Sequence, residues 1–436
     1  MAVGIQNAQA FFQTFYDEEA MQWLVPDNLP FLNMIRKEDG LSGDVIDHPF
    51  LYNPAQGYSA DFSTAMAQAG NTSRVARATL RCAQAYSMVE FFDKDRALSL
   101  GDAAYMDIVQ PVMTGKIMDF NAQLDMDLHG SGTGWRGTVG AIAGQANPIT
   151  GATLSANQIY VASGIGLETL FNQDQSIQAA TYTGFPLAGS IFPPADGRMP
   201  TTLSNTVQVA AVDSNSRTLT LSDASSFVVG SFIVQAGGAI GFNSSNTYGA
   251  IIGMDSWQPY TPNGLPSSDN FCSVNRSIYP TRLSGYAKDL SRLSIEDGIK
   301  RLSAHMSQGG ARTSNVALIN PLDFDALDSK LMTNTRYSTV QTATHGFDSI
   351  VINGAAGRID CVPDPHQVQG FVRVIDPSTW VLRHKMAIPH IVDVEGKTME
   401  QAPNFDGRTA RLRMYAQLVC NAPHKNGVAK IASVNV

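Results

Sequence analysis

The sequence predicts an α+β protein made of several structural units. Three observations support this class. Residues 106–128 carry the apolar pattern of a long helix, residues 140–275 combine strand patterns with many Gly, Ser, Thr and Asn residues, and strand and helix patterns alternate after residue 294. The chain of 436 residues is longer than one hydrophobic core usually supports, so we expect two or three domains, or a main domain with insertions.

The composition is that of a folded chain with few charges. Hydrophobic residues make up 44% of the sequence and charged residues 16%, so neighbouring copies of the chain are expected to cover much of its surface. The net charge of -8 gives no long-range attraction for nucleic acid, and sequence-specific binding is not expected. The N-terminus lacks a signal-peptide pattern and no run of about eighteen apolar residues occurs, so we expect neither export nor a membrane span.

The first hundred residues predict extended structures that need a partner. Residues 1–57 resemble an arm, with aromatic residues at 11–16 and a proline-punctuated piece at 25–30. Residues 58–99 predict a long extended hairpin, because the stretch around 77–82 alternates polar and small apolar side chains. A two-stranded ribbon is marginally stable alone, so we expect it to lie on another subunit. Three arginines are predicted to contact carboxylates of a neighbouring subunit, with a solvated face as the alternative: Arg74, Arg77 and Arg81.

A long helix is expected to end in a glycine loop. Its apolar positions recur at steps of three and four, and Pro111 suggests a start or a kink there. His129 and Gly130 mark its C-terminus. Gly132, Gly134 and Gly137 have the G-x-G-x-x-G spacing of a dinucleotide-binding loop. Such a loop must follow a strand and open a helix, whereas this one follows a helix whose negative end repels phosphate, so we interpret these glycines as a hinge loop.

Later segments carry clearer local signals. Within the insertion, residues 206–212 and 218–221 predict a hairpin, and residues 227–234 a further strand. Ser294 begins a helix with a capping-box-like start that ends at Gly309, and Asn320 followed by Pro321 begins another helix after a buried strand at 315–319. Further strands are expected at 371–375, 380–384 and 410–420, and a tight turn at residues 426–427 leads into a last short strand.

No constellation for catalysis is found. The sequence has no Walker loop, H-E-x-x-H, G-x-S-x-G or C-x-x-C motif, and its four cysteines are expected to be free thiols. A metal shared by His384 and His390 is unsupported by the pattern. Asp360 and Asp364 flank Cys361 next to two prolines, which favours a rigid structural turn. We therefore expect a protein that is not an enzyme and has no cofactor or metal.

Three stretches in this order resemble the major capsid protein of tailed bacteriophages, the Hong Kong 97 type shell fold. Residues 124–134 are similar to the end of its spine helix and the following glycine-rich loop. Residues 316–327 with Lys330 resemble the strand, Asn-Pro and helix of its axial domain. Residues 411–427 are similar to its closing peripheral-domain strand. The resemblance covers most of the chain outside the insertion.

The resemblance implies an arrangement of domains. It comprises an N-terminal arm at 1–57, an extended hairpin (E-loop) at 58–99, the spine helix and glycine loop of the peripheral domain at 100–139, a β-rich insertion domain at 140–275, the axial domain with peripheral-domain parts at 276–400 and closing peripheral strands at 401–436.

The resemblance also implies a structural function. Pentamers and hexamers of the chain would close an icosahedral shell around packaged double-stranded DNA, with scaffolding, portal and decoration proteins as partners. The location would be the virion capsid, after assembly in the host bacterial cytoplasm. Some relatives link a hairpin Lys to an Asn covalently, but residues 58–93 contain no Lys, so no such bond is expected. Because this chain starts directly with the arm, scaffolding is expected from a separate protein or from a segment already removed.

Two alternatives remain at this stage. An encapsulin-type nanocompartment would have the same fold, although the large insertion favours a phage capsid. A nucleotide-binding enzyme using Gly132, Gly134 and Gly137 is the alternative from a different class.

Overall fold

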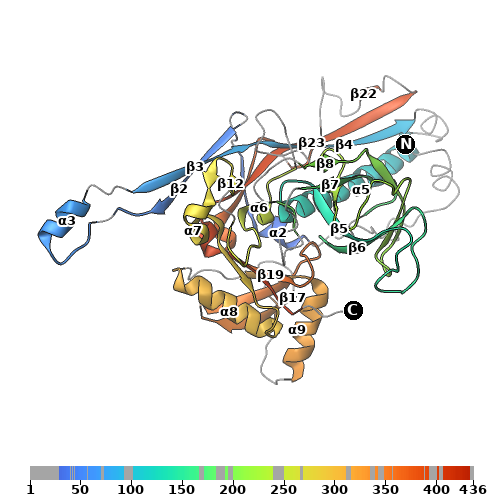
Figure 1. The fold of residues 1–436 in the computed structure, drawn as a ribbon. Coiled ribbons are helices and arrows are strands. Elements are labelled where there is room, and N and C mark those ends of the chain that lie inside the picture. Colours follow the sequence, from blue (N-terminus) through green and yellow to red (C-terminus); the bar gives the residue numbers. More distant parts are fainter. Residues whose placement is uncertain are drawn as a thin grey trace.

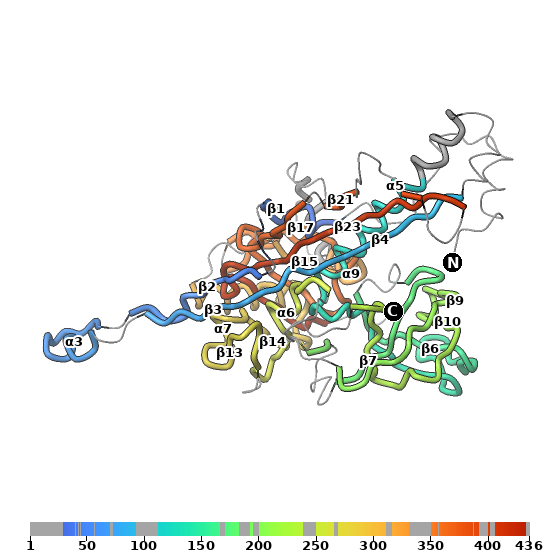
Figure 2. The backbone as a smooth tube through the Cα atoms, turned by 90° about the horizontal axis from the view of Figure 1, so that it is seen from above, coloured from blue at the N-terminus to red at the C-terminus, as the bar shows by residue number. Residues whose placement is uncertain are grey.

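The computed structural model shows a multi-layered body from which a long hairpin projects (Figures 1 and 2). The structure describes residues 29–39, 41, 43, 45–55, 57–69, 73–92, 102–165, 171–182, 192–194, 200–238, 250–265, 269–310, 316–333, 339–341, 348–355, 357–386, 388–391, 400–401 and 406–432. The aromatic segment predicted at 11–16 lies outside this part of the chain. No helix in the described part is long and apolar enough to cross a membrane.

The predicted long helix is confirmed as α5 (Asp102–His129), a helix of 28 residues that spans about 42 Å. It begins well before Pro111 and ends at the predicted residue. Phe120, Leu124 and Leu128 are buried in the main core, as the apolar pattern indicates. Met126, on another side of the helix, is buried in the core of the insertion. α5 is therefore packed from two sides and joins two hydrophobic cores.

One sheet is organised around the long strand β23 (Gly407–Cys420). Buried Ala410, Leu412 and Met414 alternate along it with more exposed residues, as predicted. One edge of β23 pairs antiparallel with β4 (Ala83–Phe92), and Figure 2 shows these two strands side by side along their length. Its other edge pairs with β20 (Trp380–His384), β21 (His390–Ile391) and β22 (Glu400–Gln401), and β1 (Arg36–Asp39) extends the sheet beside β20.

A second sheet forms the α/β part of the body. Its strand order is β14 (Tyr286–Asp289), β24 (Gly427–Lys430), β19 (Phe371–Ile375), β15 (Val316–Ile319), β18 (Gly357–Pro363), β17 (Asp348–Gly354) and β16 (Thr339–Gln341). Helices α8 (Ile295–Gln308) and α9 (Pro321–Thr333) pack beside it (Figure 1). The predicted helix starts are confirmed: Ser294 Oγ accepts the Asp297 amide at 3.2 Å, and Asn320 Oδ1 accepts the Leu322 amide at 3.0 Å.

The insertion is a closed antiparallel barrel. Neighbouring strands run in the order β11 (Phe232–Gln235), β5 (Trp135–Ala141), β6 (Gln158–Gly164), β10 (Thr218–Leu221), β9 (Val207–Asp213) and β7 (Ser176–Thr181), and β11 also pairs with β7. This last pairing closes the ring and leaves no open edge among these strands. The predicted hairpin is confirmed as β9–β10, whereas the last barrel strand begins at Phe232, later than the sequence pattern indicates.

The projecting hairpin differs from the predicted pairing. The alternating pattern places both of its strands within 58–99, but β3 (Arg74–Arg81) pairs antiparallel with β2 (Val45–Asn53), which lies before this range. Helix α3 (Phe62–Gln68) forms the tip, and β4 belongs to the sheet of β23. Two features explain the difference. Asp61 caps a helix at the tip, and residues 45–51 alternate between exposed and buried positions, so that Ile46 and Phe50 of β2 pack into the main core.

Candidate assembly interface

The root of the projecting hairpin is part of the main core. Ile46 and Phe50 of β2 and Ala78 and Leu80 of β3 are buried there. The amide of Thr79 donates to the carbonyl oxygen of Cys272 at 3.1 Å, in the turn between β12 (Asn270–Phe271) and β13 (Val274–Asn275). The hairpin is therefore anchored at its base to the body.

The outer half of the hairpin exposes large apolar side chains. Leu51 and Val75 stand directly opposite each other on the two strands and are 64% and 59% exposed. At the tip Tyr58 is 99%, Phe62 77% and Met66 64% exposed. We call these five residues the tip patch. No residue of α3 is buried, so the chain's own core does not cover it.

The tip helix is fixed by its N-cap. Asp61 Oδ2 accepts the Thr64 amide at 2.9 Å and the Thr64 hydroxyl at 2.8 Å. Hydrogen bonds from the Ser63 and Thr64 side chains and from the Thr64 amide lower the pKa of Asp61 to about 2. The carboxylate is thus ionised at neutral pH and holds the helix that presents Phe62 and Met66.

The three predicted arginines do not share one environment. Arg77 is exposed and forms an ion pair with Asp47 of the paired strand, within the same chain. Arg74 is exposed near the tip. Arg81 lies half-buried at the root, where its carbonyl oxygen accepts a hydrogen bond from Gln417 Nε2 at 2.7 Å. Their contact with a neighbouring subunit stays a prediction.

The glycine loop is buried rather than open. Gly132 and Gly134 adopt φ values of 74° and 66°, which favour glycine. The amide of Asp255 donates to the oxygen of Gly130 at 3.2 Å, and Ser256 Oγ donates to the oxygen of Ser131 at 2.6 Å. The short helix α6 (Met254–Trp257) therefore satisfies carbonyl groups at the C-terminal end of α5.

The order of elements around this loop does not form a phosphate site. Helix α5 precedes it and strand β5 follows it, the reverse of a dinucleotide-binding turn. Gly137 lies inside β5, where a Cβ atom would stand 2.8 Å from Val161 Cγ1. This glycine serves close packing within the barrel, and the nucleotide alternative has no support from the geometry.

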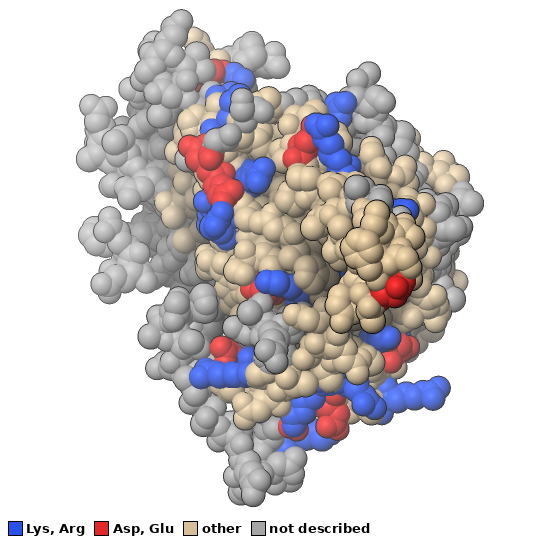
Figure 3. Space-filling view, turned by 90° about the vertical axis from the view of Figure 1, so that its left-hand side faces the viewer, with Lys and Arg blue, Asp and Glu red and all other residues tan. Residues whose placement is uncertain are grey.

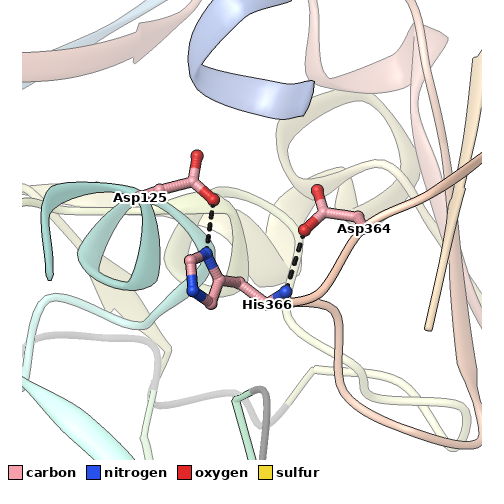
Figure 4. Close-up of side chains that lie close together, drawn as sticks. All are labelled: Asp125, Asp364 and His366. Carbon is pink, nitrogen blue, oxygen red and sulfur yellow. Dashed lines mark hydrogen bonds and ion pairs between the residues drawn. The ribbon is translucent and has the colours of Figure 1, made fainter. Parts of the chain in front are cut away.

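A buried cluster of four titratable side chains was not predicted, and Figure 4 shows three of them, Asp125, Asp364 and His366. Asp125 and His129 come from the end of α5, and Asp364 and His366 follow β18. All four are at most 3% exposed. His129 Nε2 lies 3.0 Å from Asp364 Oδ2, and His366 Nδ1 lies 2.7 Å from Asp125 Oδ2. We call these residues the junction cluster.

The junction cluster has residue types that also occur in metal sites. Asp125, Asp364 and His366 offer ligand atoms within 4.8 Å of one another. Each carboxylate oxygen, however, already has a partner in the chain. Asp125 Oδ1 accepts the amide of Leu32 at 3.1 Å, and Asp364 Oδ1 accepts the amide of His366 at 2.9 Å. The geometry therefore fits a hydrogen-bonded junction. In the sequence, the i, i+4 spacing of Asp125 and His129 on one helix was the signal that could have indicated this cluster.

A groove of about 340 Å³ lies between β4, α5 and the barrel. Its lining combines apolar side chains of Tyr86, Phe120 and Met414 with charged side chains of Lys116 and Asp119.

Comparisons with known proteins decide the fold. No protein-family model matches the sequence, and no curated protein matches it. A chain of the cyanophage A-1(L) capsid asymmetric unit superposes with a TM-score of 0.51 at 9% identity, over 97% of this chain and 98% of that one. The chain has the fold of a phage capsid protein. Two further structures are similar. The capsid of an empty GTA particle has a TM-score of 0.45 at 6% identity, over 95% of this chain and 100% of that one. An encapsulin complex from Synechococcus elongatus has a TM-score of 0.44 at 8% identity, over 99% of this chain and 96% of that one.

The likeness to this capsid chain extends over the whole architecture. The match covers nearly the whole of both chains, so the barrel, the α/β part and the hairpin all belong to one architecture. All four cysteines are buried and none forms a disulfide bond, in agreement with the expectation from the sequence.

Proposed function

We propose that this chain is a shell-forming capsid protein that assembles with copies of itself around the double-stranded DNA of a tailed bacteriophage. One observation carries the proposal: in a capsid fold, the tip patch projects beyond the body, and its side chains stay exposed among the residues that the structure describes. Large apolar side chains gathered on a projecting element are typical of a surface that another protein covers.

The free energy of the proposed contact follows from the apolar side chains that it would bury. Burying Phe62 or Met66 on a neighbour would contribute about 1.5–3 kcal/mol per side chain. The root of the hairpin is fixed in the core, so little ordering of the strands is needed when the tip binds. Repeated around a ring, such contacts favour closed assemblies over isolated subunits.

The surface charge is compatible with enclosing DNA without binding it tightly. Figure 3 shows basic and acidic side chains interspersed among uncharged ones on the face that it displays. Together with the net charge of -8, this gives no broad basic surface there.

The finer assignments belong to the same proposal. Arg74, Arg77 and Arg81 would contact neighbouring subunits, the domains would follow the expected ranges, and Gly130, Gly132, Gly134 and Gly137 would line the joint between α5 and the barrel. Assembly into pentamers and hexamers, scaffolding, portal and decoration partners, and assembly in the bacterial cytoplasm complete the proposal.

The test replaces two exposed side chains of the tip patch and leaves every core residue unchanged. The double variant F62S/M66S should keep the thermal midpoint of the wild-type chain but form no shells in negative-stain electron microscopy under conditions in which the wild type does. The matched control is V228S/V229S on the barrel, where both side chains are 51% exposed. It should form normal shells.

Two results would contradict the proposal. Normal shells from F62S/M66S would remove the tip from the interface, and a wild-type chain that forms no shells with or without its scaffolding partner would remove the shell function itself. In particles isolated from cells, nuclease-resistant double-stranded DNA supports the phage assignment, whereas a protein cargo would indicate a nanocompartment.

A further inference from the structure

The junction cluster connects three segments that are far apart in the sequence. One carboxylate oxygen of Asp125 accepts the amide of Leu32 in α2 (Pro30–Met34). The other oxygen of Asp125 contacts His366, which follows β18. His129 contacts Asp364 of the same β18 segment. The Asp364 amide in turn donates to the oxygen of Ile319, at the end of β15, at 2.8 Å. The cluster thus joins the end of α5 to the sheet of the α/β part.

The hydrogen bonds determine where the protons are. His129 Nδ1 lies 2.9 Å from the carbonyl oxygen of Asp125, and a carbonyl oxygen only accepts, so Nδ1 carries a hydrogen. His129 Nε2 faces Asp364 Oδ2 at 3.0 Å, so a second proton lies between these two atoms. With Asp364 ionised, His129 is an imidazolium held between a carbonyl group and a carboxylate.

The His366 ring is oriented by Asp125. Its Nδ1 lies 2.7 Å from Asp125 Oδ2, while its Nε2 is buried without a hydrogen-bond partner. Asp125 thereby links the end of α5 to the segment after β18, in addition to the contact that His129 makes with Asp364.

We propose that the junction cluster is a proton-locked clamp that holds the end of α5 against the β18 segment and α2, and that opens when His129 loses its proton. The proton would pass from Nε2 to the solvent, because Nδ1 is retained by the Asp125 carbonyl. Nε2 would then present a lone pair to a carboxylate oxygen at 3.0 Å. Two acceptors facing each other in a buried site repel, and both carboxylates lose their counter-charge.

The groups around His129 support this assignment. Phe31 of α2 presents an uncharged ring whose centroid lies 5.4 Å from that of His129. The His366 ring lies 6.2 Å away. Charged groups on neighbouring elements are engaged elsewhere: Asp127 of α5 pairs with Arg136 at 2.8 Å, and Asp255 of α6 pairs with Arg373. Asp125 and Asp364 are therefore the charges that face His129.

The pKa shifts agree in direction with the geometry. Burial alone would lower the pKa of His129, but the charges of Asp364 and Asp125 and the hydrogen bonds to them raise it to about 9. A raised histidine pKa stabilises the folded state fully below the unfolded pKa of 6.5 and loses that effect as the pH rises to about 9. Burial would raise the pKa of Asp364, but the charge and hydrogen bond of His129, together with the charge of His366 and the hydrogen bond from its amide, lower it below its ordinary value.

The experiment measures amide hydrogen exchange on the full, unassembled chain between about pH 6 and pH 10. Protection factors, which correct for the intrinsic pH dependence of exchange, are compared for residues 29–35, 125–134 and 362–368. In the wild type they should fall by about two orders of magnitude across this range. In H129Q the side-chain amide cannot lose a proton, so protection should be independent of pH. H305Q on α8, remote from the clamp, should follow the wild-type profile.

A second variant keeps the test decisive if H129Q does not fold. D364N removes the facing carboxylate, so the pH midpoint of the opening should move down by at least about one unit. An unchanged midpoint in D364N, or identical pH profiles for wild type and H129Q, would overturn the clamp. The outcome does not depend on shell formation, so it is separate from the test of the capsid function.

Discussion

The base of the projecting hairpin depends on a buried ion pair, which the substitution of Arg276 by Met would break. Arg276 is 1% exposed, and its Nε and one Nη atom donate to the two oxygens of Asp269 at 2.6 and 3.0 Å. Its other Nη atom donates to the carbonyl oxygen of Ser256 at 2.5 Å, and the guanidinium lies 4.4 Å from the centre of the Phe271 ring. The pair therefore closes the β12–β13 hairpin onto α6.

The expected loss of stability is large. Methionine fills much of the same volume but leaves the Asp269 carboxylate, in a residue that is 4% exposed, without a cation. Removing one member of a buried pair typically costs about 3–5 kcal/mol, because the remaining charge is left uncompensated. The double variant R276M/D269L removes that charge as well, so it should recover most of the loss and lie within about 1–2 kcal/mol of the wild type.

Urea unfolding of the unassembled chain measures these differences. The control is R358M, which removes a partly exposed pair with Asp360 at 2.8 Å and should change the free energy of unfolding by less than about 1 kcal/mol. The turn between β12 and β13 accepts the Thr79 amide, so exchange at Thr79 should also increase in R276M. A loss below about 1 kcal/mol in R276M, or a double variant as unstable as the single one, would refute the reasoning.

Three further outcomes are expected. G137A should destabilise the chain by about 1–3 kcal/mol in the same unfolding assay, because the new Cβ would stand 2.8 Å from Val161 Cγ1 and 3.1 Å from the Ser163 oxygen; a neutral effect would show that the barrel is looser than described. S294A should cost about 1 kcal/mol through loss of the N-cap of α8, and S294D should restore it. Mature particles should give a single band in reducing and non-reducing denaturing gels, since residues 58–93 contain no Lys; a ladder in both gels would reveal covalent links.

Signals confined to a few neighbouring residues predicted most of the secondary structure. The N-caps of α8 and α9 and the alternation along β23 act through residues one to four positions apart, and the structure confirms them. The resemblance to the capsid fold rests on such local stretches in order, and the structural comparison confirms it.

Features that depend on distant residues were missed. The partner of β3 could not be found from alternation alone, because β2 and β4 both alternate and only the packing of Ile46 and Phe50 selects β2. The closure of the barrel depends on β11 pairing with both β5 and β7. The junction cluster joins residues separated by more than two hundred positions, and Asp364 was interpreted as part of a structural turn.

The same distant contacts hold the body together, whereas the tip patch stays exposed among the described residues. α5 is packed from two sides, its C-terminal carbonyl groups are satisfied by α6, and its last turn is held by the junction cluster. The junction cluster adds a buried polar contact to the hydrophobic cores through which the barrel, the β23 sheet and the α/β part pack together. The hairpin shares this rigidity only at its root, where its side chains enter the main core. Because a ring of subunits closes only if each contact repeats at a fixed angle, a rigid body with one apolar projection suits self-assembly better than a chain of loosely linked domains.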